Sequence, residues 1–290
     1  MQVLVHGGAG SEPEEPDRRQ AVLDEAVSAG EGAADPRSAV VAASRVLEAN
    51  PRFNAGVGSA VQSDGRIRTD AGLMSGDGTA GAACSMLGVE RAADVARVVA
   101  EETPHVLVSG EHAVSLAEAY GVPTGADLWS ERTRSRWAQL EDRSDAGVRD
   151  QLAWVREQFG GTDTVGAVAT DGDAIATATS TGGRWAALAG RVGDVPQVGS
   201  GFFASERAAA SATGAGEAIA RFGLARAVVE AIEDGDDPGT ATDRAIRGFG
   251  AATGEEAGVI AVDTDGRTGS AFNSDGMQTA SNDPSSVRER

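Results

Sequence analysis

The sequence predicts an α/β fold in which helices cover a core of β-strands. Strand-like and helix-like stretches alternate along the 290 residues, which is typical of layered α/β architectures. Hydrophobic residues make up 41% of the chain and aromatic residues only 4%, so the core is expected to be aliphatic. Glycines are spread along the whole chain and no Pro/Ser-rich linker divides it. We therefore expect a single domain over residues 1–290.

The first half of the chain is expected to open with a strand and to continue mainly with helices. An apolar run at residues 3–5 leads into a Gly-rich turn at residues 6–10. Residues 53–87 are dense in glycine and small residues, as in short strands and tight loops. Residues 131–161 have few apolar anchors and predict a poorly buried helix or a mobile tail. Helices are expected where apolar residues recur near helical spacing, over residues 17–30, 36–48, 92–102 and about 110–120.

The second half is expected to contain two hairpins separated by helices. Residues 164–170 and 174–180 read as strands joined by the Asp-Gly-Asp turn at residues 171–173. A second strand pair is expected at residues 258–263 and 268–272. Between the two hairpins, helices are expected over residues 204–220 and 224–233.

The charge balance bears on partners and habitat. All 25 cationic residues are arginine, and the formal net charge is −19. Nucleic acids and anionic membranes are disfavoured partners, because binding them requires cationic patches. Such an acidic surface suggests adaptation to high salt, which screens repulsion between carboxylates. A GC-rich genome that favours Arg, Ala, Asp and Gly codons would give a similar composition.

Targeting and redox features are sparse. A single cysteine, Cys84, excludes an intrachain disulfide framework and a multi-cysteine metal cluster. The N-terminus enters a strand-like run without the pattern of a signal peptide. No run of 18 apolar residues occurs. We expect a cytoplasmic protein.

The chemistry centres on Thr164, in the stretch Thr-Asp-Thr-Val-Gly of residues 162–166. A threonine hydroxyl needs a base within hydrogen-bond reach, and none of the three histidines lies in a recognisable nucleophile or ligand pattern. Cleavage of the peptide bond between Asp163 and Thr164 would free an α-amine with a pKa of about 7.7–8.0 beside the hydroxyl. One residue would then supply both nucleophile and base.

Seven stretches share their order and spacing with a known family. Together they resemble the plant-type asparaginase / isoaspartyl aminopeptidase family of N-terminal-nucleophile hydrolases, and the resemblance covers almost the whole chain. The stretches are residues 6–10 (HGGAG), 53–58 (FNAGVG), 70–76 (DAGLMSG), 164–169 (TVGAVA), 178–183 (ATSTGG), 190–196 (GRVGDVP) and 212–217 (ATGAGE).

The resemblance implies an αββα sandwich and self-cleavage into an α chain of residues 1–163 and a β chain of residues 164–290. It further implies a dimer of such processed pairs and no catalytic cofactor. Thr164 matches the nucleophile, and Thr181 matches a second threonine beside it. Thr213 and the backbone N–H of Gly214 match the oxyanion hole.

The resemblance also assigns a substrate site for a free amino-acid head group. Arg191 matches the residue that holds the α-carboxylate, and Asp194 matches the acceptor for the α-ammonium group. Asn54 and Gly216 match residues that line this site. A structural sodium ion is implied as well, held by the main-chain carbonyls of Leu47, Glu48, Asn50, Phe53, Ala55 and Val57.

Departures from the family pattern bear on the substrate. Asp163 stands where many relatives have glycine, although Asp-Thr also occurs among them and in glycosylasparaginases. Val195 replaces a more usual serine, and residues 184–189 lack the usual Lys and Pro. The expected reaction is hydrolysis of L-asparagine or β-aspartyl peptides, with a glycosylasparaginase-like amidase as the alternative.

Two further alternatives come from outside this reaction. An unprocessed homologue that only binds its ligand would keep the motifs. A nucleotide-binding protein is suggested by the Gly-rich run at residues 7–10, but a Gly-Lys-Ser/Thr loop cannot exist in a chain without lysine.

Overall fold

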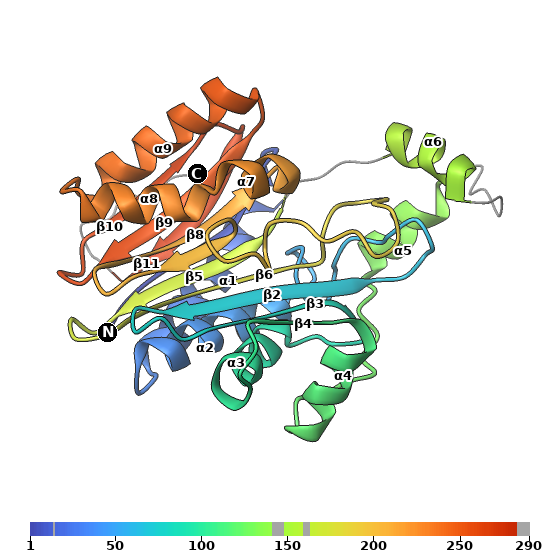
Figure 1. Ribbon diagram of the computed structural model, residues 1–290. Helices are drawn as coiled ribbons and strands as arrows, with labels where there is room; N and C mark the ends of the chain where they lie inside the picture. The colour runs from blue at the N-terminus through green and yellow to red at the C-terminus, as the bar shows by residue number, and fades with distance from the viewer. Residues whose placement is uncertain (14, 141–147, 159–162, 283–290) are drawn as a thin grey trace.

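In the computed structural model, two β-sheets formed by the described residues pack face to face, with helices on their outer faces (Figure 1). The structure describes residues 1–13, 15–140, 148–158 and 163–282. The first sheet consists, in spatial order, of β11 (Gly276–Ser281), β1 (Gln2–Gly10), β5 (Val165–Thr170), β6 (Ile175–Thr181), β2 (Arg68–Ser75), β3 (Ala80–Leu87) and β4 (Leu107–Ser109). The second consists of β10 (Thr268–Phe272), β9 (Ala257–Asp263), β8 (Ala208–Gly214) and β7 (Phe202–Ala204). β4 runs parallel to β3, whereas the other neighbouring strands run antiparallel.

Helices cover both sheets from outside, which confirms the αββα arrangement (Figure 1). On the first sheet lie α1 (Pro16–Glu31), α2 (Pro36–Glu48), α3 (Ala92–Glu102) and α4 (Gly110–Ala119). On the second lie α8 (Leu224–Glu233) and α9 (Pro238–Thr253), while the short α7 (Gly216–Phe222) follows β8. Asp35 and Asp237 cap α2 and α9 with their side chains, and a proline follows each cap.

The space between the sheets is filled mainly by aliphatic side chains. Leu4, Val168 and Ile175 of the first sheet pack against Ile260 and Val262 of the second. Each such fully buried side chain contributes about 1.5–3 kcal/mol. The hydrophobic effect is not directional, so the exact offset of the sheets depends on how these side chains interlock and on the polar contacts between the sheets.

One predicted helix is wrong. Residues 204–220 were expected to be helical, but they contain the end of β7, all of β8 and most of α7. Alanine favours helices in isolation, yet every residue of β8 is buried between β9 and β7, and its small side chains suit close packing on both faces. The other expected helices and both hairpins are confirmed, whereas β4, α9 and β11 were not anticipated.

The segment before Thr164 contains α5 (Glu131–Ala138) and α6 (Val148–Gln158). Most of the described α5 side chains are exposed, as predicted, but Trp137 packs edge-on against Trp129, Trp154 and Trp185. The alternative of a mobile tail falls partly on residues 141–147 and 159–162, which lie outside the described residues.

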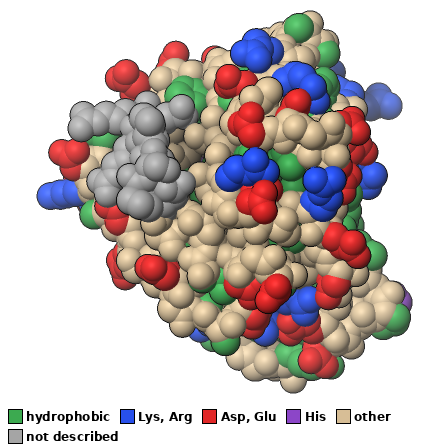
Figure 2. Space-filling model, turned by 90° about the vertical axis from the view of Figure 1, so that its left-hand side faces the viewer, with side chains coloured by type: hydrophobic (Ala, Val, Ile, Leu, Met, Phe, Trp, Pro, Cys, Tyr) green, Lys and Arg blue, Asp and Glu red, His purple; other side chains and the backbone are tan. Residues whose placement is uncertain are grey.

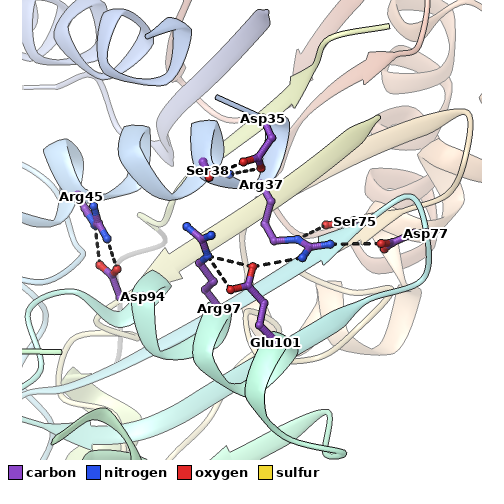
Figure 3. A network of polar contacts seen from close by, with 9 residues as sticks. All are labelled: Asp35, Arg37, Ser38, Arg45, Ser75, Asp77, Asp94, Arg97 and Glu101. Carbon is purple, nitrogen blue, oxygen red and sulfur yellow. Dashed lines mark hydrogen bonds and ion pairs between the residues drawn. The ribbon is translucent and has the colours of Figure 1, made fainter. Parts of the chain in front are cut away.

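Arginines lie beside carboxylates over much of the surface shown in Figure 2. Figure 3 shows one such network, in which Arg37 of α2 contacts Glu101 of α3 at 3.2 Å and Asp77 of the β2–β3 turn at 3.3 Å. Arg45, near the end of α2, pairs with Asp94 of α3. Single surface pairs contribute about 0–1 kcal/mol each. Together they tie α2, which leads into the loop that carries Asn54, to its neighbours.

Candidate active site

Thr164 lies directly before β5, at the end of the first sheet. Its side chain is buried, and Oγ1 donates a hydrogen bond to Oγ1 of Thr181 over 3.2 Å. Thr181 is the last residue of β6, and the pairing of Val165 with Ser180 places the two threonines side by side on one face of the sheet. The structure thus brings the two predicted threonines together.

Asn54 holds the peptide carbonyl that precedes Thr164. Its Nδ2 donates to the carbonyl oxygen of Asp163 over 2.6 Å and to that of Gly183 over 2.7 Å. Its Oδ1 accepts the N–H of Ala60 over 2.8 Å, which fixes the orientation of the amide. The sequence placed Asn54 in the site, but its contact with the Asp163 carbonyl could be seen only in the fold.

The Asp163 side chain is largely enclosed. Burial raises the pKa of its carboxyl group, although the charges of Arg19 and Arg132 act in the opposite direction. Gly8 of β1 lies close by, and a Cβ atom there would come within 2.9 Å of Asp163 Oδ1. Asp163 also borders a cavity of about 570 Å³ on the side of Arg19 and Arg132.

Thr213 and Gly214 form the end of β8, on the second sheet. Thr213 is fully buried, and its Oγ1 accepts the N–H of Ala9 over 3.3 Å, which joins β8 to the Gly-rich end of β1. Gly214 has a φ of +135°, and a Cβ atom there would lie 2.6 Å from Cα of Ala257. Only glycine fits this backbone.

Arg191 and Asp194 lie together beside the start of α7. A Cβ atom on Gly216 would come within 2.6 Å of Asp194 Oδ1 and 2.8 Å of Arg191 Nη2, so this glycine leaves room for both groups. One narrow cavity joins this pair to the threonines. It is lined by Asp163, Thr164, Thr181, Gly183, Arg184, Arg191, Gly193, Asp194, Gly214 and Gly216.

Comparison with known proteins assigns the family. A family model described as Asparaginase matches residues 1–289. The chain belongs to the asparaginase family. It is 39% identical to the plant-type L-asparaginase of Pyrococcus abyssi, over 96% of this chain and 95% of that protein. It is also 39% identical to that of Pyrobaculum calidifontis, over 99% and 98%. The isoaspartyl peptidase/L-asparaginase of Xenopus laevis is 36% identical, over 96% of this chain and 91% of that protein.

This asparaginase-family chain has charged groups in the site to which the sequence assigned no role. Glu217, in the first turn of α7, accepts from Arg191 Nε over 2.7 Å and from Arg184 Nη1 over 3.2 Å. Burial raises the pKa of Glu217, but the hydrogen bond and charge of Arg191 outweigh this effect and leave it below its usual value. Glu217 closes the 212–217 stretch, which was the available signal for it.

Two buried carboxyl groups near Arg191 are hard to ionise. Burial raises the pKa of Asp194 to about 6, although Arg191 opposes the shift. Burial likewise raises the pKa of Asp70 to about 7, and the neighbouring Asp194 adds to it. Asp70 pairs in register with Thr181 and accepts the N–H of Ser85 over 2.6 Å.

The loop expected to hold sodium follows α2 and is tightly folded. The carbonyl of Glu48 accepts the N–H of Val57 over 2.8 Å, and that of Asn50 accepts the N–H of Phe53 over 3.2 Å. A Cβ atom on Gly56 would lie 2.2 Å from the Glu48 carbonyl oxygen, so main-chain oxygens crowd this turn. Hard cations prefer oxygen ligands, and several of these carbonyls already accept main-chain N–H groups. A sodium ion in this loop stays a prediction.

Metal clusters and membrane spans can be assessed for the described residues. Within them, no group of three or more His, Cys, Asp or Glu side chains is arranged to hold a metal ion. None of the helices in this part of the chain has the length and hydrophobicity to cross a membrane.

Proposed function

We propose that this asparaginase-family chain cuts itself before Thr164 and then hydrolyses L-asparagine or β-aspartyl peptides, releasing aspartate. The observation that carries the proposal is the narrow cavity that Thr164 and Thr181 line together with Arg191 and Asp194. A guanidinium group beside a carboxylate suits a free amino-acid head group, and the adjacent hydroxyl suits attack on its side-chain carbonyl.

Self-cleavage starts from the arrangement of Asn54, Asp163 and Thr164. The Thr164 hydroxyl adds to the Asp163 carbonyl carbon, while the Asn54 amide stabilises the developing charge on the oxygen. The carbon–nitrogen bond then breaks, and the nitrogen takes a proton and becomes the α-amine of Thr164. Water splits the resulting ester, which leaves a carboxyl group on Asp163 and restores the Thr164 hydroxyl.

Substrate hydrolysis uses the freed N-terminus. The α-amine of Thr164 accepts the proton of its own hydroxyl, which attacks the side-chain carbonyl of the bound substrate. Thr213 and the N–H of Gly214 are the proposed donors to the oxyanion. The leaving ammonia or amine takes the proton, and water then hydrolyses the aspartyl ester on Thr164. No catalytic cofactor enters these steps.

Intact-mass measurement tests the proposal. We expect the purified chain to yield fragments of residues 1–163 and 164–290, and hydrolysis to grow with the cut fraction. Thr164→Ala should abolish both. A parent protein that stays at 29.3 kDa and still hydrolyses substrate would overturn the mechanism, and a homologue that only binds ligand would show neither event.

Three substrates separate the related activities. The relatives are named plant-type L-asparaginase and isoaspartyl peptidase/L-asparaginase, which favours L-asparagine and β-aspartyl dipeptides over glycosylated asparagine. Turnover of glycosylated asparagine alone would instead support the glycosylasparaginase-like alternative. The proposed assembly is a dimer of cut pairs with a sodium ion in the loop after α2.

A further inference from the structure

A chain of buried polar side chains crosses from one sheet to the other beneath the site. His6 Nε2 lies 2.9 Å from Ser211 Oγ, which lies 2.7 Å from Thr179 Oγ1. Thr179 in turn donates to the carbonyl of Gly201 over 3.1 Å. All three side chains have an exposed fraction of 0%. We call His6, Ser211 and Thr179 the inner polar chain.

The inner polar chain lies next to the proposed catalytic threonines, displaced from them by two residues along the strands. Thr179 precedes Thr181 by two residues on β6, and Ser211 precedes Thr213 by two residues on β8. Side chains two residues apart on a strand point to the same face. A hydrogen bond between Thr179 and Ser211 therefore joins the strand of the nucleophile's partner to the strand of the oxyanion hole.

Gly166 makes room for the contact between His6 and Ser211. It lies on β5, two residues after Thr164 and opposite His6 in register. A Cβ atom at this position would come within 1.9 Å of Ser211 Oγ and 2.5 Å of His6 Nε2. The absence of a side chain at Gly166 of β5, the strand that follows Thr164, is thus what allows His6 and Ser211 to meet.

His6 is a neutral structural link and not the missing base. Burial lowers the pKa of His6 to about 3, and hydrogen bonding to the main chain of Thr164 only partly opposes the shift. The Thr164 hydroxyl donates to Thr181 and not to the imidazole. His6 therefore contacts Ser211 and not the Thr164 hydroxyl.

We infer that the inner polar chain sets the separation between the nucleophile on the first sheet and the oxyanion donors on the second. The inference rests on the proposed function and makes His6, Ser211 and Thr179 positioning residues. The hydrophobic effect between the sheets is not directional, whereas hydrogen bonds add a preferred distance and angle. A misplacement of about 1 Å can reduce turnover by about a hundredfold, so this separation has a direct effect on rate.

The test measures kcat and KM of Ser211→Ala and Thr179→Val, with rates normalised to the cut fraction found by intact mass. We expect kcat to fall about tenfold to a hundredfold because the reacting groups are misplaced. KM should stay within about twofold, because Arg191 and Asp194 are untouched. Thr179→Ser, which keeps the hydroxyl, should restore kcat to near the parental value.

Thr177→Val is the matched control. Thr177 lies on the same face of β6, is fully buried, and donates across the sheets to the carbonyl of Ala210 over 3.1 Å. It is two residues farther from the site than Thr179. We expect it to lower the unfolding midpoint as much as Thr179→Val does, yet to keep kcat.

Two results would overturn the inference: parental kcat in folded Ser211→Ala or Thr179→Val, or an equal loss of kcat in Thr177→Val. If Ser211→Ala does not fold, Thr179→Val supplies the same test from β6. Thr164→Ala in the same assay reports separately on the proposed nucleophile. An active Thr164→Ala variant would refute the proposed function. An inactive one supports the nucleophile, and the role of the inner polar chain is then decided by the Ser211, Thr179 and Thr177 variants.

Discussion

The side-chain amide of Asn54 donates to the main-chain carbonyl of Asp163 over 2.6 Å, at the bond proposed to be cut. Because Ala60 holds Oδ1 of the same amide, the donor already points at the oxygen on which charge would develop. This arrangement separates two tasks. Asn54 faces the carbonyl of the chain itself, whereas Thr213 and Gly214 are proposed to serve the substrate.

Replacing Asn54 should slow self-cleavage. Loss of one preorganised donor to an oxyanion reduces rates by about a hundredfold to a thousandfold, and we expect Asn54→Ala to fall in this range. The rate of appearance of the 164–290 fragment measures it. Asn282→Ala removes an amide that donates to the Met1 carbonyl far along the chain, and it should cut at the parental rate. Cleavage of Asn54→Ala at that rate would contradict the assignment.

Glu217→Gln should weaken substrate binding. Glu217 orients Arg191 through a 2.7 Å hydrogen bond, and its own side chain is 41% exposed, so solvent screens part of the interaction. A loss of about 1 kcal/mol corresponds to a KM about fivefold higher for L-asparagine, with kcat nearly unchanged. Glu230→Gln, which breaks an exposed pair with Arg226 on α8, is the control. An unchanged KM in Glu217→Gln would show that Arg191 does not need this support.

The pH profile should show two protonations on its acid side. The Thr164 amine must be neutral, with an ordinary pKa of about 7.7–8.0, and Asp194 must be ionised, with its pKa raised to about 6. As the pH falls, log kcat/KM should decline with a slope near one below about 8 and near two below about 6. The charged groups that act on Asp194 are Arg191, Arg184, Glu217 and Asp70.

Asp194→Asn should remove only the lower step of that profile. The slope should remain near one down to pH 5, on a lower plateau because the α-ammonium group loses its acceptor. Asp70→Asn serves as the control, since it removes a neighbouring buried carboxyl group and should retain the step assigned to Asp194. Persistence of a slope of two in Asp194→Asn would assign that step to another group.

Gly214→Ala should cost more stability than Gly254→Ala. Both glycines have positive φ, +135° at Gly214 and +72° at Gly254. A Cβ atom added at Gly254 would meet no atom within 4 Å, whereas one added at Gly214 would lie 2.6 Å from Cα of Ala257. The left-handed conformation alone costs an alanine about 1–2 kcal/mol, which we expect for Gly254→Ala. Contact with Ala257 should raise the cost at Gly214 to about 3 kcal/mol or more. Denaturant unfolding of both variants measures the difference, and equal losses would contradict the crowding.

Most of the site residues were assigned through the family resemblance, because they lie in short stretches that match its motifs. Side chains two residues apart on a strand share a face of the sheet, as Thr179 and Thr181 do on β6 and Ser211 and Thr213 do on β8. Arg191 and Asp194 are near neighbours in sequence, so their proximity follows locally. The family assignment then orders these local pieces along the chain.

The remaining features depend on contacts between distant segments. Asn54 reaches a carbonyl 109 residues away, and His6 meets Ser211 across 205 residues, which no local pattern encodes. The failed helix at residues 204–220 has the same cause, because burial between β7 and β9 overrides the helical preference of alanine.

The order of strands in the first sheet has a consequence for the cut protein. β1 precedes Thr164 in sequence, yet it lies between β11 and β5, which both follow Thr164 in sequence. β2, which also precedes Thr164, pairs with β6 on the other side of β5. A cut before Thr164 would therefore leave two chains whose strands alternate within one sheet. The chains could separate only if the hydrogen bonds of that sheet were broken. Folding would therefore have to precede the proposed cut, and the two fragments would stay associated for as long as the sheet remains folded.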